Sequence, residues 1–213
     1  KDCVLIKKSS EGYVLEDKFE KMLNENLEFL KMVDELIQYG IENYQENYSD
    51  SYKDTDFQLY QKYTYEDVCR LLNWQRNMNA QNIGGYFYDA TTKTLPVFIN
   101  YDKSDNISDT TKYEDHFVSN NQLIAISKSG RSLESEDVQN FLHARERNID
   151  VQLFVRKNKD DKISKEFYYL GRMTATGEAK EFVMPNTEKT AVEILWTLDV
   201  PVKEDLYEYI MSE

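Results

Sequence analysis

The chain has 213 residues, with 26 Lys or Arg against 39 Asp or Glu, so its formal net charge is −13 at pH 7. This length suffices for one large domain, or for a compact domain with a smaller helical appendage. The acidic total taken alone argues against a nucleic-acid partner, because phosphate contacts supply much of the affinity of such proteins. No window approaches the roughly 20 apolar residues that span a bilayer.

Cysteine and histidine are too sparse to indicate a disulfide framework or a zinc site. Cys3 and Cys69 stand alone, and the two histidines are His116 and His143. Since the sequence has no CxxC pair and no Cys/His cluster, we expect no metal and no cofactor. It also shows no charged-then-apolar leader, and we expect a cytoplasmic protein without a membrane partner.

The first part of the chain is predicted to be helical. From Asp17 to Tyr39 apolar residues recur every three or four positions, which is the spacing of an amphipathic helix, and Gly40 is well placed to end it. Residues 41–48 continue as a second short helix. The polar, acidic stretch from Ser49 to Phe57 has turn character and indicates a boundary.

We therefore expect a helical docking segment over residues 1–60 and a β-rich recognition domain over residues 61–213. The domain begins with a helix capped by Thr64, with Asp67 near the positive end of the helix dipole. Aromatic and β-branched runs then predict six strands, at Gly85–Tyr88, Leu95–Tyr101, Leu123–Ser127, Val151–Arg156, Glu166–Arg172 and Ala191–Leu198. An interior helix over Ser135–Asn148 and a last helix after Pro201 complete the prediction. The fold class is α+β, a small mixed β-barrel or strongly curved sheet with an N-terminal helical appendage.

A polar loop that ends in a double glycine has the composition of a recognition element. Its amide side chains, which offer both donors and acceptors, are Asn79, Gln81 and Asn82. The glycines at 84 and 85 allow a positive φ or a close approach to a partner. Tyr86 and Tyr101 flank the loop and are candidates to stack on bases. The alternative is a glycine-rich turn into a hairpin.

Cations gather in one part of the acidic chain. Residues 128–172 hold 10 basic and 8 acidic residues, a net charge of +2. In the run SKSGR, Lys128 and Arg131 follow a predicted strand and are candidate phosphate contacts. A predicted hairpin over Gln152–Met173 brings three more, which we expect at one end of the sheet: Arg156, Lys157 and Arg172. The alternative is that these bases balance neighbouring acids or lie on a solvated hairpin tip.

The sequence shows little that would support catalysis. It has no GxxxxGK[ST] phosphate-binding loop, and its two histidines exclude an HExxH zinc helix. Glu178 and Lys180 match the short end of the pattern of metal-dependent nucleases, which requires at least one further carboxylate close to Glu178 in space. We predict that this chain has no catalytic residues and is not an enzyme by itself.

Six blocks in a fixed order carry a family resemblance: YTYEDVCRLLNW, NMNAQNIGGYFYD, PVFINYDKS, KYEDHFVSNNQLIAISKSGRSLES, QLFVRKNKDDKISKEFYYLGRM and AVEILWTLDVPV. Together they resemble the uncharacterised domain at the C-terminal end of bacterial DEAD/DEAH-type helicases, many of which carry a phospholipase-D-type nuclease domain at the other end. The resemblance covers residues 15–210. It implies a restriction-like, defence-type assembly in which a nuclease cuts, a motor translocates and this module chooses the target.

From the resemblance we expect a DNA-recognition module that binds DNA and the helicase/nuclease domains of the same polypeptide. An aromatic-lined barrel similar in outline to those that read modified bases would suit that role. The acidic surplus favours a confined contact over extended wrapping of DNA. Two alternatives stay open. One is a protein-interaction or regulatory module of the helicase, which fits the acidic helical front end, and the other is the metal-dependent nuclease.

Overall fold

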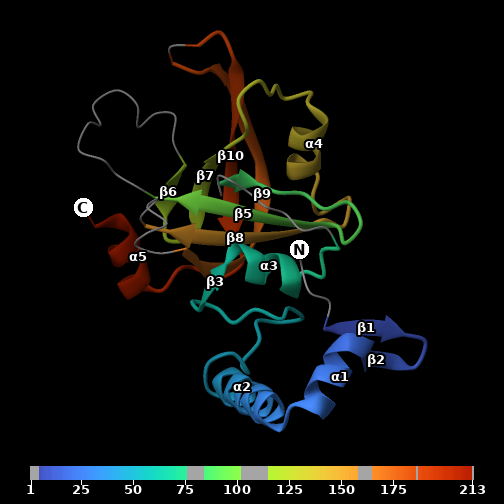
Figure 1. Ribbon diagram of the computed structural model, residues 1–213. Helices are drawn as coiled ribbons and strands as arrows, with labels where there is room; N and C mark the ends of the chain where they lie inside the picture. Colours follow the sequence, from blue (N-terminus) through green and yellow to red (C-terminus); the bar gives the residue numbers. More distant parts are fainter. Residues whose placement is uncertain (1–4, 76–83, 102–114, 158–164, 186, 213) are drawn as a thin grey trace. The chain divides into compact units, whose positions relative to one another are not determined.

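The fold is described in a computed structural model for residues 5–75, 84–101, 115–157, 165–185 and 187–212 (Figure 1). The chain forms two compact units, Lys1–Asp50 and Ser51–Glu213. The units therefore divide between Asp50 and Ser51 rather than after Tyr60. Within the described residues, no helix has the length and apolar character needed to cross a membrane.

The first unit is a hairpin followed by two helices: β1 (Ile6–Ser9), β2 (Gly12–Leu15), α1 (Asp17–Glu25) and α2 (Leu27–Asn47). The helical prediction is confirmed, but the break lies at Asn26 and not at Gly40. The Asn26 Oδ1 atom accepts hydrogen bonds from the backbone N–H groups of Glu28 and Phe29, at 3.1 and 3.0 Å. Asparagine satisfies the free amides of a helix start, so it begins α2, whereas Gly40 is accommodated inside that helix.

The second unit is built on one mixed sheet with three helices among its described residues. The strands are β3 (Lys62–Thr64), β4 (Gly85–Tyr86), β5 (Thr94–Asn100), β6 (His116–Ser119), β7 (Gln122–Ile126), β8 (Asp150–Arg156), β9 (Glu166–Val183) and β10 (Thr190–Leu198). The helices are α3 (Tyr65–Leu71), α4 (Glu136–Leu142) and α5 (Glu204–Met211). The order in the sheet is β4-β5-β8-β9-β10-β7-β6, with β3 on β9. The β5–β8 pair is parallel, and the other described pairs are antiparallel.

The sheet curls because its longest strand is irregular at two glycines. The register of β9 with β8 shifts between Gln152 and Phe154, and its register with β10 shifts between Ile194 and Trp196. Gly171 and Gly177 lie in the corresponding parts of β9 with φ of +89° and +92°. A bulge with a left-handed glycine bends a strand and increases its twist. Figure 1 accordingly shows β9 and β10 crossing the direction of β5 and β8, and the expected α+β fold with a strongly curved sheet is confirmed as a curled half-barrel.

Both faces of the central strands are covered. One face carries Leu95, Val97 and Ile99, which share a core with apolar residues of α4 and α5. The other face is aromatic, with Phe57 only 1% exposed and its ring centroid 4.9 Å from that of Tyr169. Residues 51–60 therefore contribute to the core of the second unit, which explains why its boundary precedes them.

The helix ends show which local signals hold. The capping box at α3 is confirmed, since Thr64 Oγ1 accepts from the Asp67 N–H at 3.2 Å while Asp67 Oδ2 accepts from the Thr64 N–H at 3.1 Å. The interior helix is shorter than predicted and ends at Leu142. The Ser135 hydroxyl does not cap it; its Oγ accepts from the Ser132 N–H at 2.9 Å and closes the turn before α4.

Candidate nucleic-acid interface

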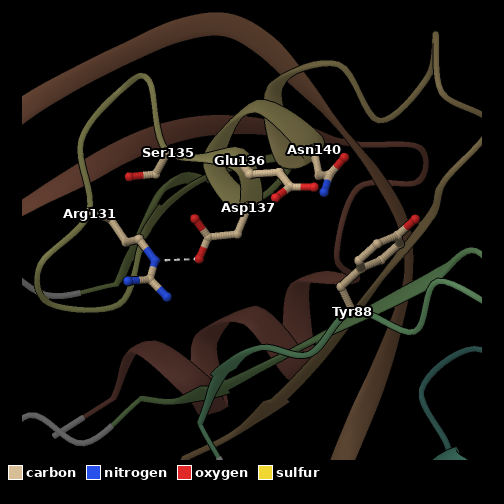
Figure 2. A pocket seen from close by; sticks show the side chains of 6 residues that line it. All are labelled: Tyr88, Arg131, Ser135, Glu136, Asp137 and Asn140. Atoms are coloured by element: carbon tan, nitrogen blue, oxygen red, sulfur yellow. Dashed lines mark hydrogen bonds and ion pairs between the residues drawn. The ribbon is translucent and has the colours of Figure 1, made fainter.

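A pocket of about 510 Å³ lies between the residues just after β4 and the start of α4 (Figure 2). Figure 2 shows the Tyr88 ring on one side, Arg131 on the other and Asp137 between them. We call this the α4 pocket, and its lining residues are Tyr88, Arg131, Ser135, Glu136, Asp137 and Asn140. It therefore joins an aromatic ring, a guanidinium, two carboxylates and an amide at one opening.

Arg131 and Asp137 hold each other in place. Arg131 Nε donates to Asp137 Oδ2 at 2.5 Å. The loop that carries Arg131 is fixed to the start of β10, because the N–H of Gly130 donates to the Thr190 carbonyl oxygen at 2.7 Å. Asp137 also accepts from the Val138 N–H at 3.0 Å. The salt bridge leaves the Arg131 side chain 39% exposed, so the guanidinium retains donors for a ligand.

The remaining groups of the α4 pocket are suited to hydrogen bonding with a neutral ligand. The Glu136 side chain has no hydrogen-bond or ionic partner among the described residues, and its carboxylate can only accept hydrogen bonds. Asn140 Oδ1 accepts from Arg147 Nη1 at 2.6 Å, which leaves the Asn140 amide N–H groups available. With two carboxylates and one guanidinium the pocket is net negative, so it favours a ligand with amino donors over a phosphate.

A second pocket, of about 370 Å³, adjoins the first and also has Tyr88 in its wall. We call it the polar pocket, and its lining residues are Asn73, Gln75, Tyr88, Asp89, Ala90, Thr91 and Thr92. Its floor is a fixed turn, because Asp89 Oδ2 accepts from the Thr92 N–H and hydroxyl at 2.9 and 3.0 Å. The turn is anchored further by Trp74, whose Nε1 donates to Thr94 Oγ1 at 2.7 Å.

The structure places the predicted aromatic contacts in the core. Tyr86 is 4% exposed, and its ring stacks on Phe141 with the centroids 4.2 Å apart. Its hydroxyl donates to the Ala125 carbonyl oxygen at 3.2 Å and accepts from Trp196 Nε1 at 2.9 Å. Burial raises the pKa of the Tyr86 hydroxyl well above its usual value. Tyr101 is 5% exposed and donates to Met211 Sδ at 2.9 Å.

These burials have one physical reason: Tyr86 in β4 and Tyr101, directly after β5, both place their side chains in the core that is shared with α4 and α5. The predicted amide contacts Asn79, Gln81 and Asn82 lie outside the described residues. Neither Tyr86 nor Tyr101 has a ring face open for stacking on a base, so we do not retain them as candidate contacts.

The five predicted phosphate contacts do not converge. The expectation that Arg156, Lys157 and Arg172 share one end of the sheet is wrong, because Gln152 is the register partner of Arg172 while Arg156 ends β8. Four residues of strand separate these positions, about 13 Å at about 3.3 Å per residue. Two cations on opposite arms of a hairpin lie at the same end of the sheet only if each is the same number of residues from the turn.

Three of these cations already contact neighbouring side chains of the same unit. Arg156 is 5% exposed, with its Cζ atom 4.5 Å from the Phe167 ring centroid. Arg172 forms salt bridges with Asp54 and Asp150, and its pKa is raised, first of all by the hydrogen bonds to Asp150. Lys157 Nζ donates to the Ser212 hydroxyl at 2.6 Å.

Of the predicted cations, Arg131 lines the α4 pocket. Lys128 is not among the lining residues, and its Nζ atom is 5.5 Å from the ring centroid of Phe87. The sequence prediction missed Tyr88, Glu136, Asp137 and Asn140. One signal in the sequence could have found Glu136 and Asp137: they lie only five and six residues after Arg131, in the first turn of the next helix.

The described residues contain no group of three or more His, Cys, Asp or Glu side chains that could hold a metal ion. Lys180 has Glu193 as its register partner across β9 and β10. Glu178 is exposed. No metal-binding cluster therefore supports the nuclease alternative in this part of the chain.

Comparison with known proteins gives one sequence family. Residues 57–210 match the family described as a domain of unknown function (DUF3427). No curated protein matches the chain.

Solved structures with a similar outline have low sequence identity. The SUVH5 SRA complex with methylated CHH DNA matches with a TM-score of 0.42 and 14% identity, covering 69% of this chain and 92% of that one. KRYPTONITE in complex with mCHH DNA, an H3(1–15) peptide and SAH matches with a TM-score of 0.48 and 10% identity, covering 83% and 39%. Arabidopsis thaliana SUVH6 with SAM matches with a TM-score of 0.42 and 10% identity, covering 73% and 29%. The likeness to these structures lies in the outline of the fold.

Proposed function

The chain belongs to the DUF3427 family of domains of unknown function, and we propose that its β-rich unit is a non-catalytic module that recognises DNA by taking a modified base into the α4 pocket. The observation that carries this proposal is the combination of side chains at that pocket. The Tyr88 ring offers a stacking face, while Glu136 and Asn140 offer an acceptor and donors. Proteins that extrude a base hold it by stacking and by hydrogen bonds to its Watson–Crick edge.

The electrostatics of the pocket narrow the class of base. Carboxylates accept hydrogen bonds from the exocyclic amino group of cytosine or adenine. A pocket with Glu136 and Asp137 therefore favours a base with an exocyclic amino group over thymine, which has none. Arg131, which lines the pocket, and Lys128, three residues before it in the chain, supply the contact to the backbone phosphates. This small cationic area on an acidic chain fits a confined contact.

Anisotropy titrations of the full chain with labelled duplexes test the proposal. The duplexes share one sequence and carry either plain cytosine or a modified cytosine at a single position. We expect tighter binding of a modified duplex, and a slope of log Kobs against log salt near −2, from about −0.9 for each of two phosphate contacts. Lys128→Ala should reduce the magnitude of that slope by about 1. Failure of every duplex to bind at low salt would refute the proposal.

A variant of Tyr88 locates the binding. Stacking of a base on an aromatic ring contributes about 1–3 kcal/mol, so Tyr88→Ala should weaken binding of the modified duplex by roughly 5- to 150-fold. Tyr209→Ala is the matched control, because Tyr209 is 49% exposed and lines neither pocket. Urea unfolding of both variants separates a lost contact from a lost fold. Equal affinities for the two variants would show that the base is held elsewhere.

We also propose that the module selects targets for helicase and nuclease domains of a bacterial, defence-type polypeptide that includes this chain. Support comes from the resemblance of the ordered sequence blocks to the C-terminal domain of such helicases. The test is cleavage of modified and plain DNA by the parent polypeptide with Tyr88→Ala. We expect ATP-dependent activity on plain DNA to stay constant while the preference for modified DNA falls. An unchanged preference would contradict the assignment.

A second candidate function, protein binding, has one specific observation in its favour. No residue of α2 is buried, and its exposed apolar side chains include Leu36 at 68%, Ile37 at 53% and Tyr44 at 54%. Amphipathic helices with exposed apolar stripes bind grooves on partner proteins. Substitution of Ile37 by Gln should abolish co-purification with the helicase domains if this function holds, and should leave DNA binding unaffected.

A further inference from the structure

From the two adjoining pockets we infer that the preferred modification is a neutral, polyhydroxylated substituent of the base, such as a glycosyl group, held in the polar pocket. This inference rests on the proposed base recognition and names its substrate class. Both pockets have Tyr88 in their walls, so a group attached to a base on one side of that ring can reach the other. A substituent held there would lie beside the turn from Asp89 to Thr92.

The size of the polar pocket exceeds what a methyl group fills. A methyl group occupies about the volume of a water molecule, roughly 30 Å³. The polar pocket, at about 370 Å³, therefore has room for a substituent an order of magnitude larger. A module that read only a methyl mark would leave this pocket to solvent.

The lining chemistry of the polar pocket matches a polyol. The side chains of Asn73, Gln75 and Thr91 have no hydrogen-bond partner among the described residues. Amides and hydroxyls both donate and accept, which is the requirement for pairing with sugar hydroxyls. The Tyr88 ring adds an apolar face, against which the C–H groups of a sugar ring can pack.

The described lining of the polar pocket favours a neutral substituent over an anionic one. Among the described residues that line it there is no Lys or Arg, and the one charged side chain among them is Asp89. That carboxylate is 7% exposed and already accepts two hydrogen bonds from Thr92. A phosphate or carboxylate substituent would lie beside this buried acid. A neutral substituent meets no such repulsion.

The rigidity of the turn makes the pocket a preformed site. Thr92 bonds both to Asp89 and, through its hydroxyl, to Thr94 Oγ1 at 2.8 Å. Trp74, which is 9% exposed, anchors Thr94 from the opposite side. Side chains on such a turn need little reordering when a ligand binds, and preorganisation of this kind improves affinity.

The experiment compares the full chain on three duplexes that differ at one cytosine, which is plain, 5-hydroxymethylated or 5-glucosyl-hydroxymethylated. We expect the glucosylated duplex to bind at least tenfold more tightly than the hydroxymethylated one, which corresponds to 1.4 kcal/mol. The double variant Gln75→Ala/Thr91→Val should reduce this preference to threefold or less and leave the affinity for the hydroxymethylated duplex unchanged. Thr174→Val is the control, because Thr174 is an exposed threonine of β9 that lines neither pocket.

The outcomes separate this inference from the proposed function. Tighter binding of the hydroxymethylated duplex than of both others would overturn the glycosyl assignment and leave base recognition standing. A glucosyl preference that persists in the double variant would show that the substituent is not held in the polar pocket. If no duplex binds at low salt, both the inference and the proposed function fail.

Discussion

Tyr86→Phe should destabilise the second unit without changing its affinity for DNA. The substitution removes one hydroxyl that is buried between Trp196 Nε1, at 2.9 Å, and the Ala125 carbonyl oxygen, at 3.2 Å. A buried donor left without an acceptor costs about 1–3 kcal/mol. Trp196 is 0% exposed, so bulk solvent does not reach its N–H group to replace the lost acceptor, and we expect the upper half of that range, about 2–3 kcal/mol.

Urea unfolding followed by tryptophan fluorescence measures this change. The two tryptophans of the chain, Trp74 and Trp196, are both buried in the second unit, so the signal reports on that unit. With an m-value of about 2 kcal/mol/M, the midpoint should fall by about 1–1.5 M. The melting temperature should fall by roughly 4–12 °C, since each kcal/mol shifts a unit of this size by about 2–4 °C.

The control is Tyr209→Phe, which removes a hydroxyl from a side chain that is 49% exposed. Its effect should stay within about 0.5 kcal/mol. The affinity of Tyr86→Phe for a modified duplex should equal that of the unsubstituted chain. A midpoint like that of the control, together with a loss of DNA binding, would refute the placement of the Tyr86 hydroxyl in the core.

Three further predictions concern backbone strain, pH and capping. Gly171→Ala combines a φ of +89° with a Cβ only 3.1 Å from Leu59 Cδ2, so it should cost about 1–3 kcal/mol more in urea unfolding than Gly177→Ala, which has a φ of +92° and nothing within 4 Å. Equal losses of unfolding free energy in the two variants would show that the Leu59 side chain moves aside for the new methyl group. Burial raises the pKa of Tyr169 above the unfolded value of about 10, so the contribution of Tyr169 to stability should be constant below pH 10 and then fall by up to about 1.4 kcal/mol per pH unit in alkaline urea titrations. A stability that rises above pH 10 would contradict this. Asn26→Ala should raise the amide exchange rates of the first turn of α2 about fivefold, because loss of the Asn26 cap costs about 1 kcal/mol. Unchanged rates would show that the Asn26 side chain does not stabilise the start of α2.

Local patterns allowed the helices and most of the sheet to be predicted. The capping box at Thr64 involves residues three positions apart, so the sequence alone contains it. The strands β5 and β8 were evident because both of their faces are buried, which produces continuous apolar runs. The second half of β9 was not, because residues 174–183 are mostly exposed and become a strand through their pairing with β10.

The candidate site depends on contacts that no local pattern encodes. Tyr88 and Glu136 are 48 positions apart in the chain, and the fold brings them to one pocket. Tyr86 and Tyr88 are two positions apart and share one face of an extended chain, so the sequence does not reveal that Phe141 of α4 covers the Tyr86 ring while Tyr88 lines the pocket. Arg156 was misassigned for the same reason, since a strand-end cation becomes buried only when a ring such as Phe167 lies beneath it.

The strand β9 pairs with β3 and β8 near its beginning and with β10 along its second half. A single covalent segment thus belongs to both parts of the curled sheet, and neither part can separate while the other keeps its hydrogen bonds. The amide protons of Tyr169 and Met173 should therefore exchange with solvent only when the entire unit unfolds, at one common rate. Partial opening that spares either part would have to break the chain's longest strand in its middle.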